Sequence, residues 1–301
     1  MTTSYFNKVN LDLLKSQLKD VLLLDLDEFG LEHNKSGEYT SNFLGINLQS
    51  AFQPIYDVKK GDLLGHEALL RPNLGNIKEA SPEFAFSYAE ASGKLVKLDR
   101  VSRTLHVLNY NQLFQENGLL FLNVHPNHLI SVNQHGKVFE RILHAHSIPT
   151  DRVVIEIRDF NFIEQNESLL SYERQLFDAI ENYHDRGYKI GIDNFGNQYS
   201  LVSRLWKIRP DFVKFDPNVI QQSETNPRLL KSIYGFINII RDLEASPIIN
   251  GIESQTQLDI ATAAGADLVQ GYLLGRPVPV KKLQSSDLIT RHLQNGLKVG
   301  T

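Results

Sequence analysis

The residues of this chain that could do chemistry are acidic, amide and lysine side chains that stand at or near the carboxyl ends of apolar, strand-like runs. They are Glu67, Asn123, Glu156, Asp193, Lys214, Asn250 and Gln270. A single polar residue at a strand end is ordinarily a solvent boundary, and for Glu156 alone that interpretation is favoured. Their joint recurrence reverses the preference, because α/β barrels build their sites at the carboxyl ends of their strands.

The elements that must position these residues alternate between strand-like runs and amphipathic helical stretches, as a parallel α/β architecture requires. Strands are expected over 52–56, 63–70, 119–124, 153–157, 189–192, 212–215, 248–252 and 268–270. Helices are expected over 101–115, 169–184, 227–243 and 255–264. Eight strands with helices between them predict a barrel.

Short sequence signals refine this expectation. The link from Lys59 to Asp62 is too short for a parallel crossover, so the first two strands are predicted to be antiparallel. Ser81 before a proline predicts one helix start, and Ser254 with Gln257 predicts another through a capping box.

Composition is that of an ordinary globular protein. The chain has 301 residues, of which 42% are hydrophobic and 22% charged, so a full core is expected and disorder is not. With 31 Lys and Arg against 35 Asp and Glu, the formal charge is −4, and no basic surplus indicates DNA or RNA binding. The absence of cysteine excludes disulfides and thiolate metal sites. No signal segment or apolar run of ~20 residues predicts a membrane, so a cytoplasmic protein is expected.

A series of short motifs runs along the chain in this order: Gln53 to Asp57 with Glu67-Ala68-Leu69, Asn123-Val124, Val154 to Ile157, Gly191 to Gly196, Val213 to Asp216, Asn250 to Ser254, and Val269 to Leu273. In this order the motifs resemble the EAL family of cyclic di-GMP phosphodiesterases, which is named for Glu-Ala-Leu. The resemblance covers residues from about 48 to 279. It implies a modified TIM (β/α)8 barrel with one antiparallel strand.

The resemblance also implies two-metal phosphodiester hydrolysis, in which two divalent cations activate a water and stabilise the attacking and leaving oxygens. The first Mg²⁺ or Mn²⁺ would be held by Glu67, Asn123, Glu156 and Asp193, all of them oxygen donors. Catalytic roles are implied for Glu67, Lys214 and Gln270. Lys214 is expected near the metal-bound water, and a plain salt bridge to Asp193 or Asp216 is the alternative.

The second metal site departs from the family pattern. That ion would share Asp193 and depend on two further carboxylates, whose positions hold Asn194 and Asn250. An amide oxygen can bind a hard cation but brings no negative charge, so the second site is expected to be weak. The supporting segments Asn197-Gln198 and Arg158-Asp159 depart from the pattern as well.

The nucleotide contacts implied by the resemblance show no such loss. Six positions are expected to touch the bases or phosphates of cyclic di-GMP: Gln53, Leu69, Arg71, Asp216, Glu253 and Tyr272. Core packing is the alternative for Leu69 and Tyr272, and an ion pair with Glu67 is the alternative for Arg71. His125 and His128 could suggest zinc, but they are interpreted as loop residues because no matching ligand set accompanies them.

The termini lie outside the resemblance. Residues 1–45 are predicted to form an amphipathic helix and a linker, residues 46–285 the barrel and residues 286–301 a tail. Leu11, Leu14, Leu18 and Val21 make a helical stripe within residues 10–24, and the Asn, Lys, Ser and Gly of residues 32–41 indicate the linker. A homodimer is a further expectation.

Together these features predict a protein that binds cyclic di-GMP with impaired or absent hydrolysis. Two alternatives stay open. One is an active phosphodiesterase that gives linear pGpG, with the asparagines holding a weak second ion. The other is a protein-interaction module that binds no nucleotide.

Overall fold

The computed structural model describes residues 16, 30–75, 80–113, 118–131, 135–158, 169–197, 200 and 202–284 of the chain. The strands are β1 Glu32–His33, β2 Tyr39–Phe43, β3 Ile46–Asp57, β4 Leu63–Asn73, β5 Leu119–Val124, β6 Val153–Arg158, β7 Lys189–Phe195, β8 Phe212–Phe215, β9 Ser246–Ile249 and β10 Leu268–Val269. The α-helices are α2 Pro82–Ala91, α3 Leu95–Tyr110, α4 Pro126–Ser131, α5 His135–Ala145, α6 Leu169–His184, α7 Ser203–Ile208, α8 Pro217–Ser223, α9 Pro227–Asp242, α10 Gln255–Ala263 and α11 Val280–Gln284. Two 3₁₀ turns cover Asn111–Leu113 and Thr150–Arg152.

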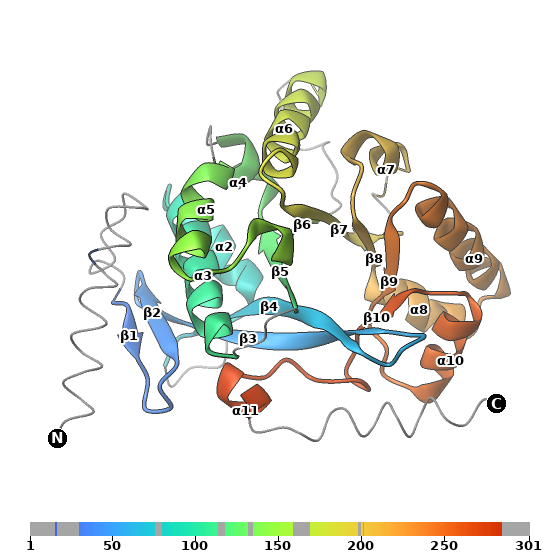
Figure 1. Ribbon diagram of the computed structural model, residues 1–301, viewed down its shortest axis with the longest axis horizontal. Coiled ribbons are helices and arrows are strands. Elements are labelled where there is room, and N and C mark those ends of the chain that lie inside the picture. Colours follow the sequence, from blue (N-terminus) through green and yellow to red (C-terminus); the bar gives the residue numbers. More distant parts are fainter. Residues whose placement is uncertain are drawn as a thin grey trace.

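Strands β3 to β10 form a closed barrel with helices around it (Figure 1). The order runs from β3 through β10, β9, β8, β7, β6 and β5 to β4, and a direct pairing of β3 with β4 closes the ring. Strand β3 is antiparallel to both of its neighbours, whereas the remaining pairs of the ring are parallel. The predicted barrel and its antiparallel first pair are confirmed. The carboxyl ends of β4 to β10 therefore meet on one face.

A small apolar cluster fills the barrel interior. It consists of one residue from each of six strands: Ile55, Phe121, Val154, Phe212, Ile248 and Leu268. The rings of Phe121 and Phe212 meet edge to face with centroids 5.2 Å apart. The larger core lies between the strands and the helices, where residues such as Ile190 of β7 and Ile237 of α9 are fully buried. The interior is thus a packed floor beneath the polar residues at the carboxyl end.

Several predicted elements match the structure closely. The bounds of β5, β8 and α6 are as predicted, and α9 ends one residue earlier. Ser81 accepts a hydrogen bond from the Phe84 amide at the start of α2. Ser254 and Gln257 form the predicted capping box of α10. Strand β9 ends at Ile249 rather than Ile252, because the Ile252 amide turns to the Gln270 carbonyl.

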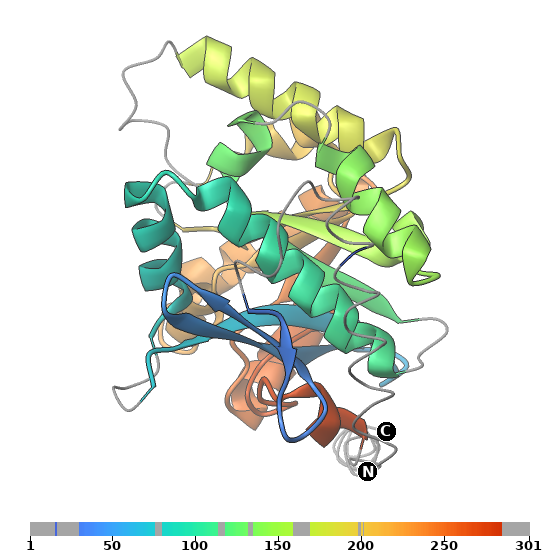
Figure 2. The ribbon, with the colours of Figure 1, turned by 90° about the vertical axis from the view of Figure 1, so that its left-hand side faces the viewer.

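The predicted linker over residues 32–41 is wrong. Strands β1 and β2 occupy this segment, and β2 pairs with β3 beyond the barrel. Asn109 of α3 fixes β2, since its amide group accepts from the Tyr39 amide at 2.8 Å and donates to the Tyr39 carbonyl at 2.9 Å. The β1–β2 ribbon consequently lies along α3 (Figure 2). The polar composition that indicated a linker belongs instead to the turns of an edge ribbon.

The predicted helix over residues 10–24, apart from Ser16, and the predicted tail over residues 286–301 lie outside the described residues. The proposed division at residues 45 and 285 stays a prediction. Among the described helices, none combines the length and apolar character that a membrane span requires.

Candidate functional site

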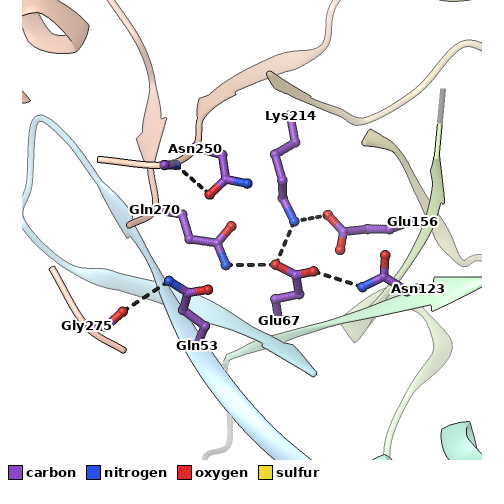
Figure 3. A network of polar contacts seen from close by, with 9 residues as sticks. Gln53, Glu67, Asn123, Glu156, Lys214, Asn250, Gln270 and Gly275 are labelled. Atoms are coloured by element: carbon purple, nitrogen blue, oxygen red, sulfur yellow. Dashed lines mark hydrogen bonds and ion pairs between the residues drawn. The ribbon is translucent and has the colours of Figure 1, made fainter. Parts of the chain in front are cut away.

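The polar residues predicted from the strand ends converge on one face of the barrel, where Figure 3 draws Glu67, Asn123, Glu156, Lys214, Asn250 and Gln270 close to one another. Glu67, Asn123, Glu156, Asp193 and Lys214 come from β4 to β8 in turn, while Asn250 and Gln270 directly follow β9 and β10. This arrangement follows from the ring, because consecutive parallel strands carry their carboxyl ends to the same rim. The sequence order of the motifs therefore becomes a circular order around the site.

Glu67 is the centre of the side-chain network. Its Oε1 accepts from Asn123 Nδ2 at 2.8 Å, and its Oε2 accepts from Gln270 Nε2 at 2.8 Å and from Lys214 Nζ at 3.0 Å. Burial opposes ionisation of Glu67, but the Lys214 charge and these hydrogen bonds outweigh it and lower the pKa of this carboxyl. Glu67 is thus held as a carboxylate in one fixed orientation.

Lys214 joins Glu67 to Glu156. Its Nζ lies 2.5 Å from Glu156 Oε1, and both side chains are almost wholly buried. Lys214 therefore forms a salt bridge, as the alternative prediction held, but its partners are Glu67 and Glu156 and not the predicted Asp193 or Asp216. Burial would lower the pKa of Lys214, but the surrounding carboxylates raise it overall.

The rim holds more carboxyl groups than the Lys214 ammonium can pair with. Burial is the main cause that raises the pKa of Glu156 well above its ordinary value, and the neighbouring carboxylates Glu67 and Asp193 add to it. Burial also raises the pKa of Asp193, with Lys214 offsetting part of the effect. Three buried carboxyl groups thus face one ammonium, an environment that favours a further cation.

The oxygen atoms of this rim are of the chemical type that binds a hard divalent ion. Glu156 Oε2 and Asp193 Oδ1 are buried and have no hydrogen-bond partner in the described part of the chain, and carboxylate and amide oxygens suit Mg²⁺ or Mn²⁺. Within the described ranges, no three His, Cys, Asp or Glu side chains are grouped closely enough to hold a metal between them. The Lys214 ammonium is paired with both Glu67 and Glu156.

Asn194 lies in an irregular part of β7. The register between β7 and β8 shifts between Ile192 and Phe195, and Asn194 has a left-handed backbone with φ of 60°. Asparagine and aspartate tolerate this conformation better than other non-glycine residues. Strand alternation places Asp193 on the opposite face from Ile192, which packs in the outer core, and Asn194 after it is half-buried.

Asn250 uses its amide oxygen locally. Its Oδ1 accepts a hydrogen bond from the adjacent Gly251 amide at 2.7 Å (Figure 3). Gly251 needs to be a glycine, because its φ is +80° and a Cβ there would lie 2.6 Å from Pro217 Cβ. The Asn250 side chain is therefore tied to its own tight turn.

The six predicted nucleotide-binding residues have diverse surroundings. Gln53 lies directly across from Glu67 in the β3–β4 ladder and donates to the Gly275 carbonyl at 3.1 Å. Arg71 donates to the Leu70 carbonyl, while Glu67 pairs with Lys214, so the alternative of an Arg71–Glu67 ion pair is wrong. Leu69 is half-buried.

Tyr272 is 47% exposed, and the Arg276 guanidinium lies 4.4 Å from its ring centroid, so core packing does not explain this tyrosine. Asp216 caps α8 through one carboxylate oxygen, which accepts from the Asn218 amide and side chain. Asp216 also lines a cavity of about 540 Å³ with Gly196, Asn197, Asn218, Val219, Gln222 and Leu229. This cavity lies beside the rim, next to the ends of β7 and β8.

Gln257 is a supporting residue whose full connections the sequence did not indicate. Its Oε1 accepts from the Glu253 amide, and its Nε2 donates to Glu224 Oε1 at 2.5 Å. The capping box was visible in the sequence, but the link to Glu224 was not, because 33 residues separate the partners. Gln257 thereby connects the exposed Glu253 to the segment after α8.

His125 and His128, which could suggest zinc in the sequence, both contact neighbouring side chains of the protein. His128 lies on α4 rather than in a loop, is wholly buried and contacts Arg103 Nη2 at 2.9 Å and Asp99 Oδ2 at 3.1 Å. His125 stacks against Phe86 with ring centroids 6.2 Å apart.

Comparison with known proteins agrees with this geometry. A family model described as the EAL domain matches residues 40–277, and the chain belongs to this family. The EAL-domain protein YkuI of Bacillus subtilis (strain 168) is 27% identical over 230 residues, which are 75% of this chain and 54% of YkuI. The cyclic di-GMP phosphodiesterase PdeL of Escherichia coli (strain K12) is 26% identical over 241 residues, 77% of this chain and 63% of PdeL. The chain thus spans less than two thirds of these relatives.

Solved structures share the fold. BlrP1 of Klebsiella pneumoniae, in a complex with calcium and cyclic di-GMP, matches with a TM-score of 0.69 and 24% identity over 77% of this chain and 56% of that one. Bacillus subtilis YkuI, in a complex with cyclic di-GMP and calcium, matches with a TM-score of 0.69 and 23% identity over 83% of this chain and 60% of that one.

Proposed function

We propose that this chain binds cyclic di-GMP in the barrel mouth and that its phosphodiesterase activity is impaired or absent. The observation that carries the proposal is the contrast within the rim. Four oxygen-bearing residues suited to one ion converge there, whereas two amides stand where the resemblance implies carboxylates for a second. The complexes of BlrP1 and YkuI with cyclic di-GMP and calcium support the choice of ligand.

One divalent ion would be held by Glu67, Asn123, Glu156 and Asp193. Two observations support this assignment: the buried oxygens of Glu156 and Asp193 that have no hydrogen-bond partner among the described residues, and the three carboxyl groups that surround a single ammonium. When bound, such an ion supplies Lewis-acid stabilisation of a phosphodiester oxygen and lowers the pKa of a bound water. Hydrogen bonds from Asn123, Gln270 and Lys214 hold the Glu67 carboxylate in one orientation.

The nucleotide contacts are proposed for Gln53, Leu69, Arg71, Asp216, Glu253 and Tyr272. Arg71 offers a planar guanidinium that can clamp a phosphate with two parallel hydrogen bonds. Asp216 and Glu253 can accept from guanine N–H groups, and the exposed ring of Tyr272 can stack on a base. The Asp216 oxygen held by Asn218 leaves the orientation of this carboxylate fixed before the ligand arrives.

Hydrolysis is proposed to fail at the second ion. Asn250 Oδ1 is engaged by Gly251, and neither Asn250 nor Asn194 brings the charge that offsets repulsion between two dications about 4 Å apart. An active enzyme with a weakly held second ion is the second candidate, and its support is the intact set around Glu67. The cytoplasmic location and a homodimer remain predictions from the sequence.

The test is calorimetric titration of cyclic di-GMP into the purified protein with EDTA, with Ca²⁺ and with Mn²⁺. Chromatography of the Mn²⁺ sample then measures the linear dinucleotide. Saturable binding with little or no linear product is expected. Rapid cleavage would establish the active enzyme instead, and absence of binding under all three conditions would favour the interaction module.

A further inference from the structure

The Lys214 ammonium occupies the centre of the proposed metal site. Its Nζ lies 2.5 Å from Glu156 Oε1 and 3.0 Å from Glu67 Oε2, and its side chain is 1% exposed (Figure 3). These two carboxylates belong to the set proposed to hold the divalent ion. An oxygen that accepts a strong charge-assisted hydrogen bond is a poorer metal ligand, since its electron pair is already engaged.

We propose that Lys214 is a tethered cation that competes with the divalent ion for Glu67 and Glu156. The proposal rests on the metal site of the proposed function, and it adds a means of regulating that site. A dication that approaches the rim meets an ammonium already bonded to two of its ligands, and like charges at such distances in a buried site repel strongly.

The surroundings of Lys214 leave it few other places to go. The side chain comes from β8 across the apolar floor of the barrel, and its Nζ lies 5.8 Å from the centroid of the buried Phe121 ring. Moving the ammonium downward would strip it of all polar partners. Binding of an ion therefore requires Lys214 either to give up Glu156 or to stay beside the new charge, and both outcomes weaken the affinity for the ion.

The same contact explains how the rim can persist without metal. Lys214 satisfies one oxygen of Glu156 and shares Glu67 with Gln270, so the central hydrogen bonds do not depend on an ion. Glu156 Oε2 and Asp193 Oδ1 remain unbonded and provide the first ligands for an entering ion. The side-chain network of the rim is thus assembled without an ion, and the metal site fills only when the free ion is abundant.

The experiment is calorimetric titration of MnCl₂ into nucleotide-free protein, comparing wild type with Lys214→Met and Lys189→Met. The control removes one lysine charge from the first residue of β7, where Lys189 lies 3.6 Å from Asp211 at the opposite end of the barrel. Lys214→Met should bind Mn²⁺ roughly tenfold tighter than wild type or better, because it frees two carboxylates and removes a repelling charge. Lys189→Met should bind as wild type does. Equal or weaker Mn²⁺ binding by Lys214→Met would overturn the competition.

A second measurement on wild-type protein guards against a Lys214→Met variant that does not fold. The hydrogen-bonded, solvent-protected ammonium should give a slowly exchanging signal in proton–nitrogen spectra of ¹⁵N-lysine-labelled protein. Saturation with Mg²⁺ should shift or broaden that signal, and an unchanged signal would overturn the proposal. Titration of cyclic di-GMP in EDTA is run alongside. Retained nucleotide binding with no effect at Lys214 rejects only the competition, whereas lost nucleotide binding rejects the proposed function.

Discussion

Two buried polar regions of the molecule differ in how completely their groups are paired. Between α3 and the strands β2 and β3, Asn109 satisfies both backbone groups of Tyr39, and Ser50 Oγ lies 2.8 Å from His106 Nδ1. At the carboxyl end of the barrel, by contrast, Glu156 Oε2 and Asp193 Oδ1 have no partner, and three carboxyl groups face one ammonium.

The difference teaches which polar layer serves the fold and which serves a ligand. Buried polar groups normally find partners, because leaving one unpaired costs free energy. The contacts of Asn109 with Tyr39 and of Ser50 with His106, here called the α3 layer, meet this requirement with neutral groups and fix the β1–β2 ribbon. At the barrel rim, two buried carboxylate oxygens find no partner among the described residues, so the chemistry of the rim depends on what binds there. Changes in the rim should alter ligand and metal behaviour, and changes in the α3 layer should alter stability.

The largest expected effect comes from restoring charge to the rim. Asn194→Asp combined with Asn250→Glu should produce Mn²⁺-dependent cleavage of cyclic di-GMP at least about a hundredfold faster than wild type, because the second ion gains two charged ligands. Asp is tolerated at position 194, where φ is 60°. Either change alone should do much less, since residues that act as a unit are not additive. Chromatography of the linear dinucleotide measures the rate.

Two results would break this account of the rim. Wild-type protein could already turn over at a rate that the double variant does not improve. Alternatively, the double variant could bind two ions by calorimetry and remain inert, which would move the cause of inactivity away from metal charge.

The next effect tests the α3 layer. Asn109→Ala removes both hydrogen bonds to Tyr39 and the weaker one to Ser50, and it leaves the Tyr39 amide and carbonyl unpaired, so it should lower the free energy of unfolding by about 2–3 kcal/mol. Asn42→Ala is the control, because Asn42 accepts only from the exposed Gly45 amide in the turn after β2. Urea unfolding measures both. A loss of nucleotide affinity without a loss of stability in Asn109→Ala would contradict the division between the two layers.

These layers also mark what the sequence could predict. Repeated polar residues at strand ends located Glu156, Asp193 and Gln270 correctly, because strand order turns a linear pattern into a ring. The same pattern could not assign Lys214 its partners, since contacts across a barrel depend on strand tilt and stagger rather than on spacing. The Asn109–Tyr39 contact spans 70 positions, and nothing local in residues 32–41 distinguishes an edge ribbon from a linker.

The pH dependence of stability should come partly from neutral buried histidines. Burial lowers the pKa of His66 to about 4, and burial with the nearby Arg71 charge lowers the pKa of His106 to about 3. The unfolded chain takes up protons below an ordinary pKa of 6.5, so stability is complete above that pH and is lost as the pH falls toward 4. Each residue should contribute about 1.4 kcal/mol per pH unit in this window.

Urea midpoints between pH 7 and pH 5 measure this slope. His66→Gln should reduce the slope, whereas His144→Gln should leave it unchanged, because the His144 side chain is 64% exposed. If the urea midpoint depended on pH equally in wild type and His66→Gln, this histidine would take up its proton in the folded protein as well. His66 would then not be a neutral buried residue.

The smallest expected effect separates the two ways in which the rim could hold a nucleotide. Arg71→Ala should weaken cyclic di-GMP binding about tenfold even in EDTA, because the guanidinium clamps a phosphate without help from metal. The affinity of Arg71→Lys should fall between those of wild type and Arg71→Ala, since lysine keeps the charge and loses the planar fork.

Glu67→Gln should leave the cyclic di-GMP affinity in EDTA nearly intact and remove the additional affinity that Ca²⁺ provides, because Glu67 acts through the ion. Calorimetry of these variants, each with EDTA and with Ca²⁺, decides between the mechanisms. If Glu67→Gln lost the same amount of cyclic di-GMP affinity in EDTA and in Ca²⁺, the carboxylate would position the nucleotide directly rather than through an ion. The contacts of Glu67 would then serve to hold the site together, as those of Asn109 do in the α3 layer.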